Sequence, residues 1–235
     1  MQIALTLVSP DASQPRAAVA GLSEALAGAQ ARVKEPRPLG PGAIDLLVEA
    51  PALEPVRRIA RGALADLPID VCVQPWEGRR KRLLVADMDS TIIGCECLDE
   101  LADFAGMKAQ VSAITERAMR GEIAFEGALR ERVAMLKGLP VQALEQAYAE
   151  RVRLNPGART LVRTMAANGA RCVLVSGGFN FFTERVAAVA GFHANRANTL
   201  GEAAGALTGL VGEPILGREA KLAALTEEAA GLGVP

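Results

Sequence analysis

The sequence predicts an α/β chain in two parts: a small α+β unit, then an open parallel sheet with a helical insertion. Three observations predict it. Strand-like and helix-like segments alternate over residues 1–75. Two short apolar runs, Leu83–Ala86 and Arg171–Ser176, are typical of strands buried on both faces of a parallel sheet. Between those runs, residues 98–152 follow an almost purely helical pattern.

The segments of residues 1–75 follow the order β-α-β-β-α-β, which is the ferredoxin-like arrangement. Alternating apolar residues predict the strands, and Ala and Leu at helical spacing predict the helices. Gly28 is placed to end the first helix, and residues 39–42 (Leu-Gly-Pro-Gly) form a strong turn signal. The predicted strands are Ile3–Ser9, Ala31–Arg37, Ala43–Glu49 and Ile69–Gln74, and the predicted helices are Gln14–Ala27 and Leu53–Leu67.

Residues 76–82 are polar and basic, and we expect a solvated linker there. The second unit then covers residues 83–235, with a helical insertion at about 97–153 that is broken at Gly106, Gly121 and residues 138–140. Strands followed by helices place an active site at the carboxyl ends of the strands. The later predicted elements are a helix from Asn155-Pro156-Gly157, a helix over Phe179–Ala190, strands over Asn195–Leu200 and Ala206–Val211, and a helix over Glu219–Ala230.

Composition excludes several classes of protein. The net charge of −1 argues against nucleic acid or a membrane surface as the main partner. No apolar run reaches the ~20 residues that span a bilayer, and the segment Met1–Val8 lacks the basic leader of a signal peptide, so we expect a cytoplasmic protein. Cys95 and Cys97 lack zinc-site partners and are expected to be reduced thiols, and the single histidine, His193, is expected to be structural.

The first buried strand ends in two aspartates, Asp87 and Asp89. If the strand continues, both side chains face one pocket at the sheet edge. Like charges that close need help to stay ionised, and a divalent cation supplies it. One carboxylate could then attack phosphorus while the other gives a proton to a leaving oxygen. Taken alone, the pair also fits capping aspartates at a strand-to-helix turn.

The second buried strand ends in Ser176-Gly177-Gly178, at the same sheet edge. A hydroxyl beside glycine amides that open a helix would form a seat for an anion. A plain strand-to-helix turn is the competing interpretation. Both motifs on successive sheet strands favour a phosphate pocket.

Together with Glu96, residues 118–121 (Ala-Met-Arg-Gly), Phe125 and Arg132-Val133, these motifs resemble the phosphoserine phosphatases of the haloacid dehalogenase superfamily. The resemblance runs from about Leu83 to the C-terminus. It implies a HAD-like Rossmannoid sheet with the helical insertion as a cap that closes over the pocket. The first unit is similar, in architecture only, to the small ACT-type amino-acid-binding domain that some bacterial members carry.

The resemblance implies hydrolysis of O-phospho-L-serine to L-serine and phosphate, the last step of serine biosynthesis. Asp87 would form an aspartyl-phosphate and Asp89 would act as acid and base. Mg²⁺ would be held by the Asp87 side chain and the Asp89 backbone carbonyl. Arg132 would grip the substrate carboxylate and Glu96 its ammonium. The implied substrate-binding residues are Glu96, Met119, Phe125, Arg132, Ser176, Gly177, Gly178 and Lys221, with Arg218 as the alternative to Lys221.

One family feature is not found in the sequence: a further strand ending in a Gly-Asp-Gly-x-x-Asp loop with more acidic metal ligands. We therefore expect the C-terminal strands of the sheet to be missing, one sheet edge to be exposed, and activity to be much lower than in a chain extended past Pro235. Two other functions stay open: a phosphatase for another small phosphomonoester, and a non-catalytic amino-acid sensor. A homodimer also stays open.

Overall fold

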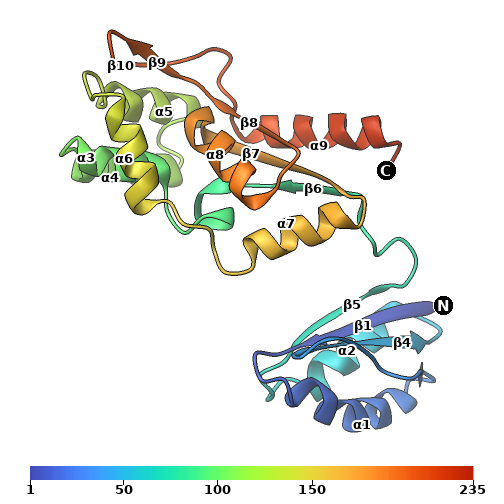
Figure 1. Cartoon of the computed structure of the whole chain (residues 1–235). Coiled ribbons are helices and arrows are strands. Elements are labelled where there is room, and N and C mark those ends of the chain that lie inside the picture. Colours follow the sequence, from blue (N-terminus) through green and yellow to red (C-terminus); the bar gives the residue numbers. More distant parts are fainter. Residues whose placement is uncertain (235) are drawn as a thin grey trace. The chain divides into compact units, whose positions relative to one another are not determined.

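The computed structural model describes residues 1–234, except for the side chain of Met119. The chain forms two compact units, Met1–Lys81 and Arg82–Pro235, each with its own hydrophobic core (Figure 1).

The first unit is an antiparallel sheet covered on one face by two helices. The strand order β2-β4-β1-β5, with β3 also paired to β4, is that of the predicted split β-α-β arrangement. Alternate residues of β1 (Ile3, Leu5 and Leu7) are fully buried beneath the helices. The elements are β1 Gln2–Val8, α1 Gln14–Ala27, β2 Arg32–Val33, β3 Arg37–Gly40, β4 Ala43–Glu49, α2 Leu53–Ala63 and β5 Asp70–Pro75.

The predicted strand Ala31–Arg37 is wrong as one element, because it is divided into β2 and β3. Pro36 lies in the gap and has no N–H to donate to the ladder of β4.

The prediction of a solvated basic segment at residues 76–82 is also wrong for one residue. The Arg79 guanidinium pairs with the buried carboxylate of Asp45 and lies 4.2 Å from the ring centroid of Trp76. This segment is therefore anchored to the first unit.

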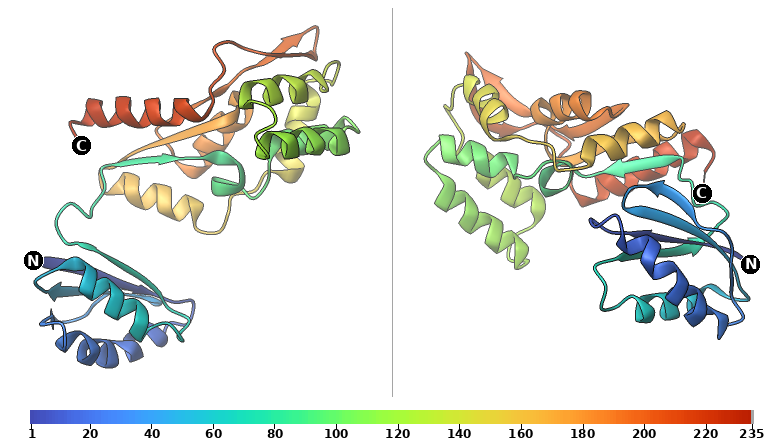
Figure 2. Two further views of the ribbon diagram at one scale, coloured as in Figure 1. Left: turned by 180° about the vertical axis from the view of Figure 1, so that it is seen from behind. Right: turned by 60° about the horizontal axis from the view of Figure 1, so that its bottom comes forward.

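The second unit is built on a parallel sheet of three strands in the order β6-β7-β8. Helix α9 packs on one face, through Ala224 against Val173 and Val175. Helices α7 and α8 cover the other face (Figure 2). The elements are β6 Leu83–Ala86, α7 Ala158–Ala167, β7 Arg171–Phe179, α8 Asn180–Ala190, β8 Ala194–Asn198 and α9 Arg218–Leu232.

Four helices form the predicted insertion, with breaks at the predicted glycines. They are α3 Cys97–Phe104, α4 Lys108–Met119, α5 Phe125–Ala134 and α6 Gln142–Arg151. The two segments that join them to the sheet lie side by side, because Ile93 and Leu154 form a β-bridge and the Asn155 N–H donates to the Ile92 carbonyl at 2.9 Å. The helices share one continuous core with the α7/α8 face of the sheet.

The predicted strand Asn195–Leu200 is divided at Thr199. Its first part is β8, which pairs with β7, and its second part begins β9 (Leu200–Ala203), which pairs with β10 (Ala206–Val211). The β9–β10 hairpin packs against α5 of the helical insertion. The sheet therefore contacts the insertion through this hairpin as well as through the two connecting segments.

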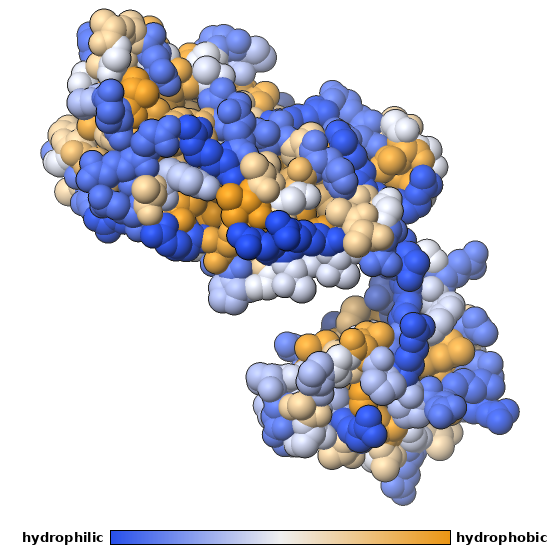
Figure 3. Space-filling model, viewed as in Figure 1, coloured by the Kyte–Doolittle hydropathy of each residue, from blue (hydrophilic) through white to orange (hydrophobic). Residues whose placement is uncertain are grey.

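Among the described strands, β6 pairs with β7 alone, so its other edge is open. A groove of about 460 Å³ follows this edge, lined by β6 together with Leu222 and Leu225 of α9. Elsewhere, hydrophilic residues cover much of the face shown in Figure 3, and hydrophobic residues appear in small groups. No helix in the described part of the chain is both long and apolar enough to cross a membrane.

Candidate active site

A pocket of about 210 Å³ lies where β6 and β7 end beneath the helical insertion. Its polar lining contains three carboxylates, one hydroxyl and two cationic side chains. The lining residues are Asp87, Asp89, Glu96, Leu98, Phe125, Leu129, Arg132, Ser176, Gly177, Gly178, Phe179 and Lys221. The structure thus brings together every predicted site residue except Met119, whose side chain lies outside what the structure describes.

Asp87 is the first residue after β6 and keeps an extended backbone. Its Oδ1 accepts a hydrogen bond from the Met88 N–H at 2.9 Å, which orients the carboxylate. Its Oδ2 forms an ion pair with Nζ of Lys221, on the first turns of α9. Of the two cations considered for this role, Lys221 and not Arg218 lies in the pocket lining.

Asp89 reaches the pocket by a different route from the one predicted. The strand ends at Ala86, and Met88–Ile92 forms a turn that is not a regular helix, because Asp89 has an extended backbone (φ −65°, ψ 137°) and Ser90 has a φ of +51°. This turn, and not the alternation of a continuing strand, aims Asp89 at the site. Its Oδ1 accepts from the Cys97 N–H at 2.9 Å, and its Oδ2 accepts from the Ser176 hydroxyl at 3.1 Å.

Burial raises the pKa of the Asp89 carboxyl above its usual value. The hydrogen bonds from Cys97 and Ser176 lower it only in part, and the charge of Asp87 raises it further. Asp89 is therefore the member of the pair better suited to hold a proton, while Lys221 neutralises the charge of Asp87.

The serine-glycine segment is a strand bulge and not the predicted start of a helix. Strand β7 continues to Phe179, and its register with β8 shifts between Val175 and Phe179. The Gly178 N–H donates to Ser176 Oγ at 2.9 Å. A side chain at Gly178 would come within 2.9 Å of Asp89 Oδ2, and one at Gly177 within 2.9 Å of the Phe125 ring. Only glycine allows the backbone to approach so closely.

Glu96 and Arg132 form the opposite, helical side of the pocket. Glu96 Oε1 accepts from the Ser90 hydroxyl at 2.6 Å, and partial burial raises the pKa of Glu96. Arg132 donates to the Ala128 carbonyl at 3.2 Å and to Thr115 Oγ1 at 3.4 Å, and has no carboxylate partner among the described residues. Burial lowers the pKa of its guanidinium. It therefore keeps donors free for an incoming carboxylate.

Sequence reasoning missed three apolar residues of the lining: Leu98, Leu129 and Phe179. A signal for Leu129 was present, because Phe125, Leu129 and Arg132 follow helical spacing on one face of α5. His193 lies outside the pocket, and its Nδ1 accepts from the Cys172 N–H at 3.0 Å, in keeping with the structural role expected for it.

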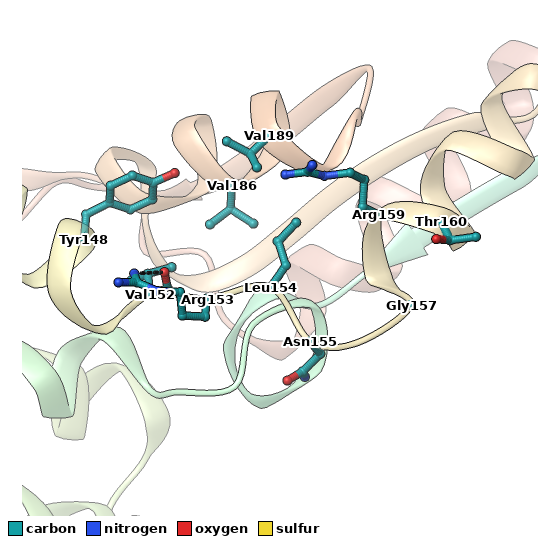
Figure 4. A pocket seen from close by; sticks show the side chains of 10 residues that line it. All are labelled: Tyr148, Val152, Arg153, Leu154, Asn155, Gly157, Arg159, Thr160, Val186 and Val189. Atoms are coloured by element: carbon teal, nitrogen blue, oxygen red, sulfur yellow. Dashed lines mark hydrogen bonds between the residues drawn. The ribbon is translucent and has the colours of Figure 1, made fainter. Parts of the chain in front are cut away.

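A second hollow, of about 400 Å³, lies between α6, α7 and α8 (Figure 4). It is larger, but the described residues that line it include no carboxylate, thiol or imidazole. Its Arg153 is already engaged, since the guanidinium donates to the carbonyls of Val152 and Ala149 at 2.7 and 2.9 Å. The smaller pocket is therefore the one equipped for chemistry.

Comparison with known proteins agrees with this geometry. The family model for haloacid dehalogenase-like hydrolases matches residues 84–235. The chain belongs to this family. This hydrolase is 48% identical over 158 residues to a Polaromonas sp. phosphoserine phosphatase. The match covers 65% of this chain and 67% of the relative. The hydrolase is 45% identical over 177 residues to a phosphoserine phosphatase of Archaeoglobus fulgidus, covering 74% of this chain and 51% of the relative. The hydrolase thus spans about half to two thirds of these relatives.

Two solved structures resemble this hydrolase. A HAD family hydrolase from Salmonella enterica serovar Typhi superimposes with a TM-score of 0.84 and 26% identity, over 100% of this chain and 80% of the other. A phospho-aspartyl intermediate analogue of phosphoserine phosphatase superimposes with a TM-score of 0.61 and 35% identity, over 66% of this chain and 74% of the other. The first likeness extends over both units, and the second covers about two thirds of the chain.

Proposed function

We propose that the pocket hydrolyses O-phospho-L-serine to L-serine and phosphate through an aspartyl-phosphate on Asp87. The observation that carries this is one pocket holding both a phosphate seat and groups of opposite charge for an amino acid: Asp87, Lys221 and the serine-glycine bulge at one side, Glu96 and Arg132 at the other. The names of the two relatives and the phospho-aspartyl analogue support it.

In the proposed reaction, an Asp87 oxygen attacks phosphorus and the bond from phosphorus to the serine oxygen breaks. Asp89, whose raised pKa favours the protonated form, gives its proton to the departing oxygen. Water then attacks phosphorus, Asp89 takes its proton, and phosphate leaves with Asp87 restored. Lys221, Ser176 and the Gly177 amide stabilise the charge of the phosphoryl oxygens.

The carboxylates of the pocket also suit a divalent cation. Phosphatases of this family generally use a metal ion. No group of three or more His, Cys, Asp or Glu that could hold a metal occurs in the described part of the chain. Mg²⁺ is often held by one or two carboxylates together with phosphate oxygens and water, so Asp87 and the Asp89 backbone carbonyl fit its needs. Bound there, Mg²⁺ would neutralise charge on the transferring phosphoryl group.

Recognition of serine follows from the helical side of the pocket. Arg132 has free donors and matches the fork geometry of a carboxylate, while Glu96, held by Ser90, can pair with an ammonium. Leu98, Phe125 and Leu129 give an apolar wall for the short serine side chain. The pocket volume of about 210 Å³ favours a small phosphorylated amino acid over a larger phosphate ester.

Phosphate release from L-phosphoserine with Mg²⁺ tests the proposal. We expect Asp87→Asn to reduce kcat at least about 10³-fold, because the amide is not a nucleophile. The exposed Asp66 of the first unit offers a matched control, and Asp66→Asn should leave the rate unchanged. Unchanged turnover in Asp87→Asn would contradict the proposal.

The same assay separates phosphoserine from other phosphomonoesters. Arg132→Ala should raise KM for phosphoserine at least about tenfold, because the carboxylate loses a charged partner. Phosphoethanolamine has no carboxylate, so its KM should stay within about twofold. Equal effects on both substrates would favour a different phosphomonoester as the natural substrate.

A further inference from the structure

Asn198 is a buried polar residue that lies behind the pocket without lining it. It ends β8 and is 2% exposed. Its side chain makes three hydrogen bonds, all to backbone. Nδ2 donates to the Gly177 carbonyl at 2.8 Å and to the Leu216 carbonyl at 3.2 Å, and Oδ1 accepts from the Leu216 N–H at 2.7 Å. Both hydrogens of the amide are thus used.

One of these bonds supports the bulge that carries the phosphate-binding groups. Val175 pairs with Arg196 and Phe179 pairs with Asn198, so four steps along β7 correspond to two steps along β8. Two residues of β7 are therefore extra, and the regular ladder is interrupted between Ser176 and Gly178. The Asn198 amide supplies the donor that the interrupted ladder cannot give to the Gly177 carbonyl.

The other two bonds hold the segment that leads into α9. Leu216 precedes Gly217, the residue that caps the N-terminus of α9, and Lys221 lies on the first turns of that helix. The ring of Phe125 lies against both glycines: a side chain at Gly177 would meet its Cζ at 2.9 Å, and one at Gly217 its Cδ1 at 3.3 Å. The Asn198 hydrogen bonds and the Phe125 ring therefore both constrain the distance between the Ser176–Gly178 bulge and the N-terminus of α9.

We propose that Asn198 is a positioning residue that sets the spacing between the two halves of the phosphate seat, the Ser176–Gly178 bulge and the lysine-bearing helix. The proposal rests on the proposed function only in that the pocket binds phosphate. It does not depend on serine being the substrate. Asn198 acts through Gly177 and Leu216 and itself contacts no reacting atom.

Binding of inorganic phosphate, measured by calorimetry with Mg²⁺ present, is the test. Asn198→Asp keeps the shape and the acceptor for Leu216 but loses both donors, and Asn198→Ala loses all three bonds. We expect the Kd for inorganic phosphate to rise at least about tenfold in each, since a misplaced seat loses its aligned contacts. The Kd for L-serine, which would contact Glu96 and Arg132, should change less than about twofold.

A matched control separates positioning from stability. Thr183 of α8 is fully buried, and its hydroxyl donates to Oδ1 of Asn195 at 2.8 Å. Asn195 lies in β8, the strand that also carries Asn198. Thr183→Val should lower the unfolding temperature without changing the Kd for phosphate. Equal weakening of phosphate and L-serine binding by the Asn198 variants, or equal loss of phosphate binding in Thr183→Val, would overturn the proposal.

A second measurement needs no variant. If Asn198 ties the seat to Leu216, phosphate should slow hydrogen exchange of the Leu216 amide at least about threefold. An unchanged exchange rate under saturating phosphate would count against the proposal. If phosphoserine is not hydrolysed but the Asn198 variants weaken phosphate binding as described, this proposal stands and the serine assignment falls.

Discussion

Asp45 is the most buried carboxylate of the first unit, and its charge partner lies in a segment that follows the last strand. The side chain is 1% exposed and accepts hydrogen bonds from Thr6 and Arg79. Burial alone would raise the pKa of Asp45, but the hydrogen bonds from Arg79 and Thr6 and the charge of Arg79 together hold it below the usual 3.8.

The lowered pKa fixes the sign of a pH effect. Because the folded state favours the ionised form, the stabilisation is present above about pH 4 and is lost as the pH falls through the lowered pKa. Asp45→Asn should therefore reduce the free energy of unfolding by about 1–3 kcal/mol at pH 7, and by less as the pH falls below about 4. Denaturant titration from pH 7 to 3 measures this, with the exposed Asp70→Asn as control. A difference that stays constant down to pH 3 would contradict it.

At the scale of elements, the β9–β10 hairpin is tied to the turn between α5 and α6 by backbone hydrogen bonds. The Gly138 N–H donates to the Leu207 carbonyl at 2.8 Å, and the Leu207 N–H donates to the Leu139 carbonyl at 2.9 Å. Gly209 of β10 has a φ of +77°, and a Cβ there would lie 2.9 Å from Cβ of Lys137. The hairpin thus holds the helical insertion through a close backbone approach.

Gly209→Ala should lower the free energy of unfolding of the second unit by at least about 2 kcal/mol, from backbone strain and displacement of α5 together. Gly205 provides the matched control. It has a similar φ of +79° but open space around it, so Gly205→Ala should cost only about 1 kcal/mol. Thermal unfolding of both variants measures the difference, and equal losses would show that the contact with the insertion contributes nothing.

At the scale of the whole molecule, the two cores share no residue. Strand β5 is the last strand of the first unit, and Arg79, which follows it, pairs with Asp45. Residues 1–81 therefore contain all the residues of their own core. The boundary after Lys81 differs from the predicted end at residue 75, because the basic segment pairs with Asp45.

A fragment of residues 1–81 should therefore fold alone and unfold cooperatively. A fragment of residues 1–75 lacks Arg79 and should be less stable by about 1–3 kcal/mol. Circular dichroism during urea unfolding compares the two fragments. A gradual, non-cooperative transition in the longer fragment would mean that the first unit depends on the rest of the chain.

Local sequence was enough to determine most of the order of elements and the part of the pocket formed by the aspartates and the serine-glycine segment. Periodicity gave α1 and β4 with their observed bounds, because residues a few positions apart share a face of a helix or strand. This part of the pocket was predictable because Asp87 and Asp89 follow one buried strand and Ser176 lies near the end of the next, and parallel strands end at one sheet edge. Lys221 and Arg132 required the family resemblance.

Tertiary structure alone decided the contacts between segments far apart in the chain. No spacing in the sequence marks Arg79 as the partner of Asp45, or Asn198 as the residue that joins Gly177 to Leu216. A buried polar group must find a hydrogen-bond partner, but which partner it finds depends on where the packed elements place it. Periodic patterns indicate which face of an element is buried, but they do not identify the hydrogen-bond partners of a buried polar group.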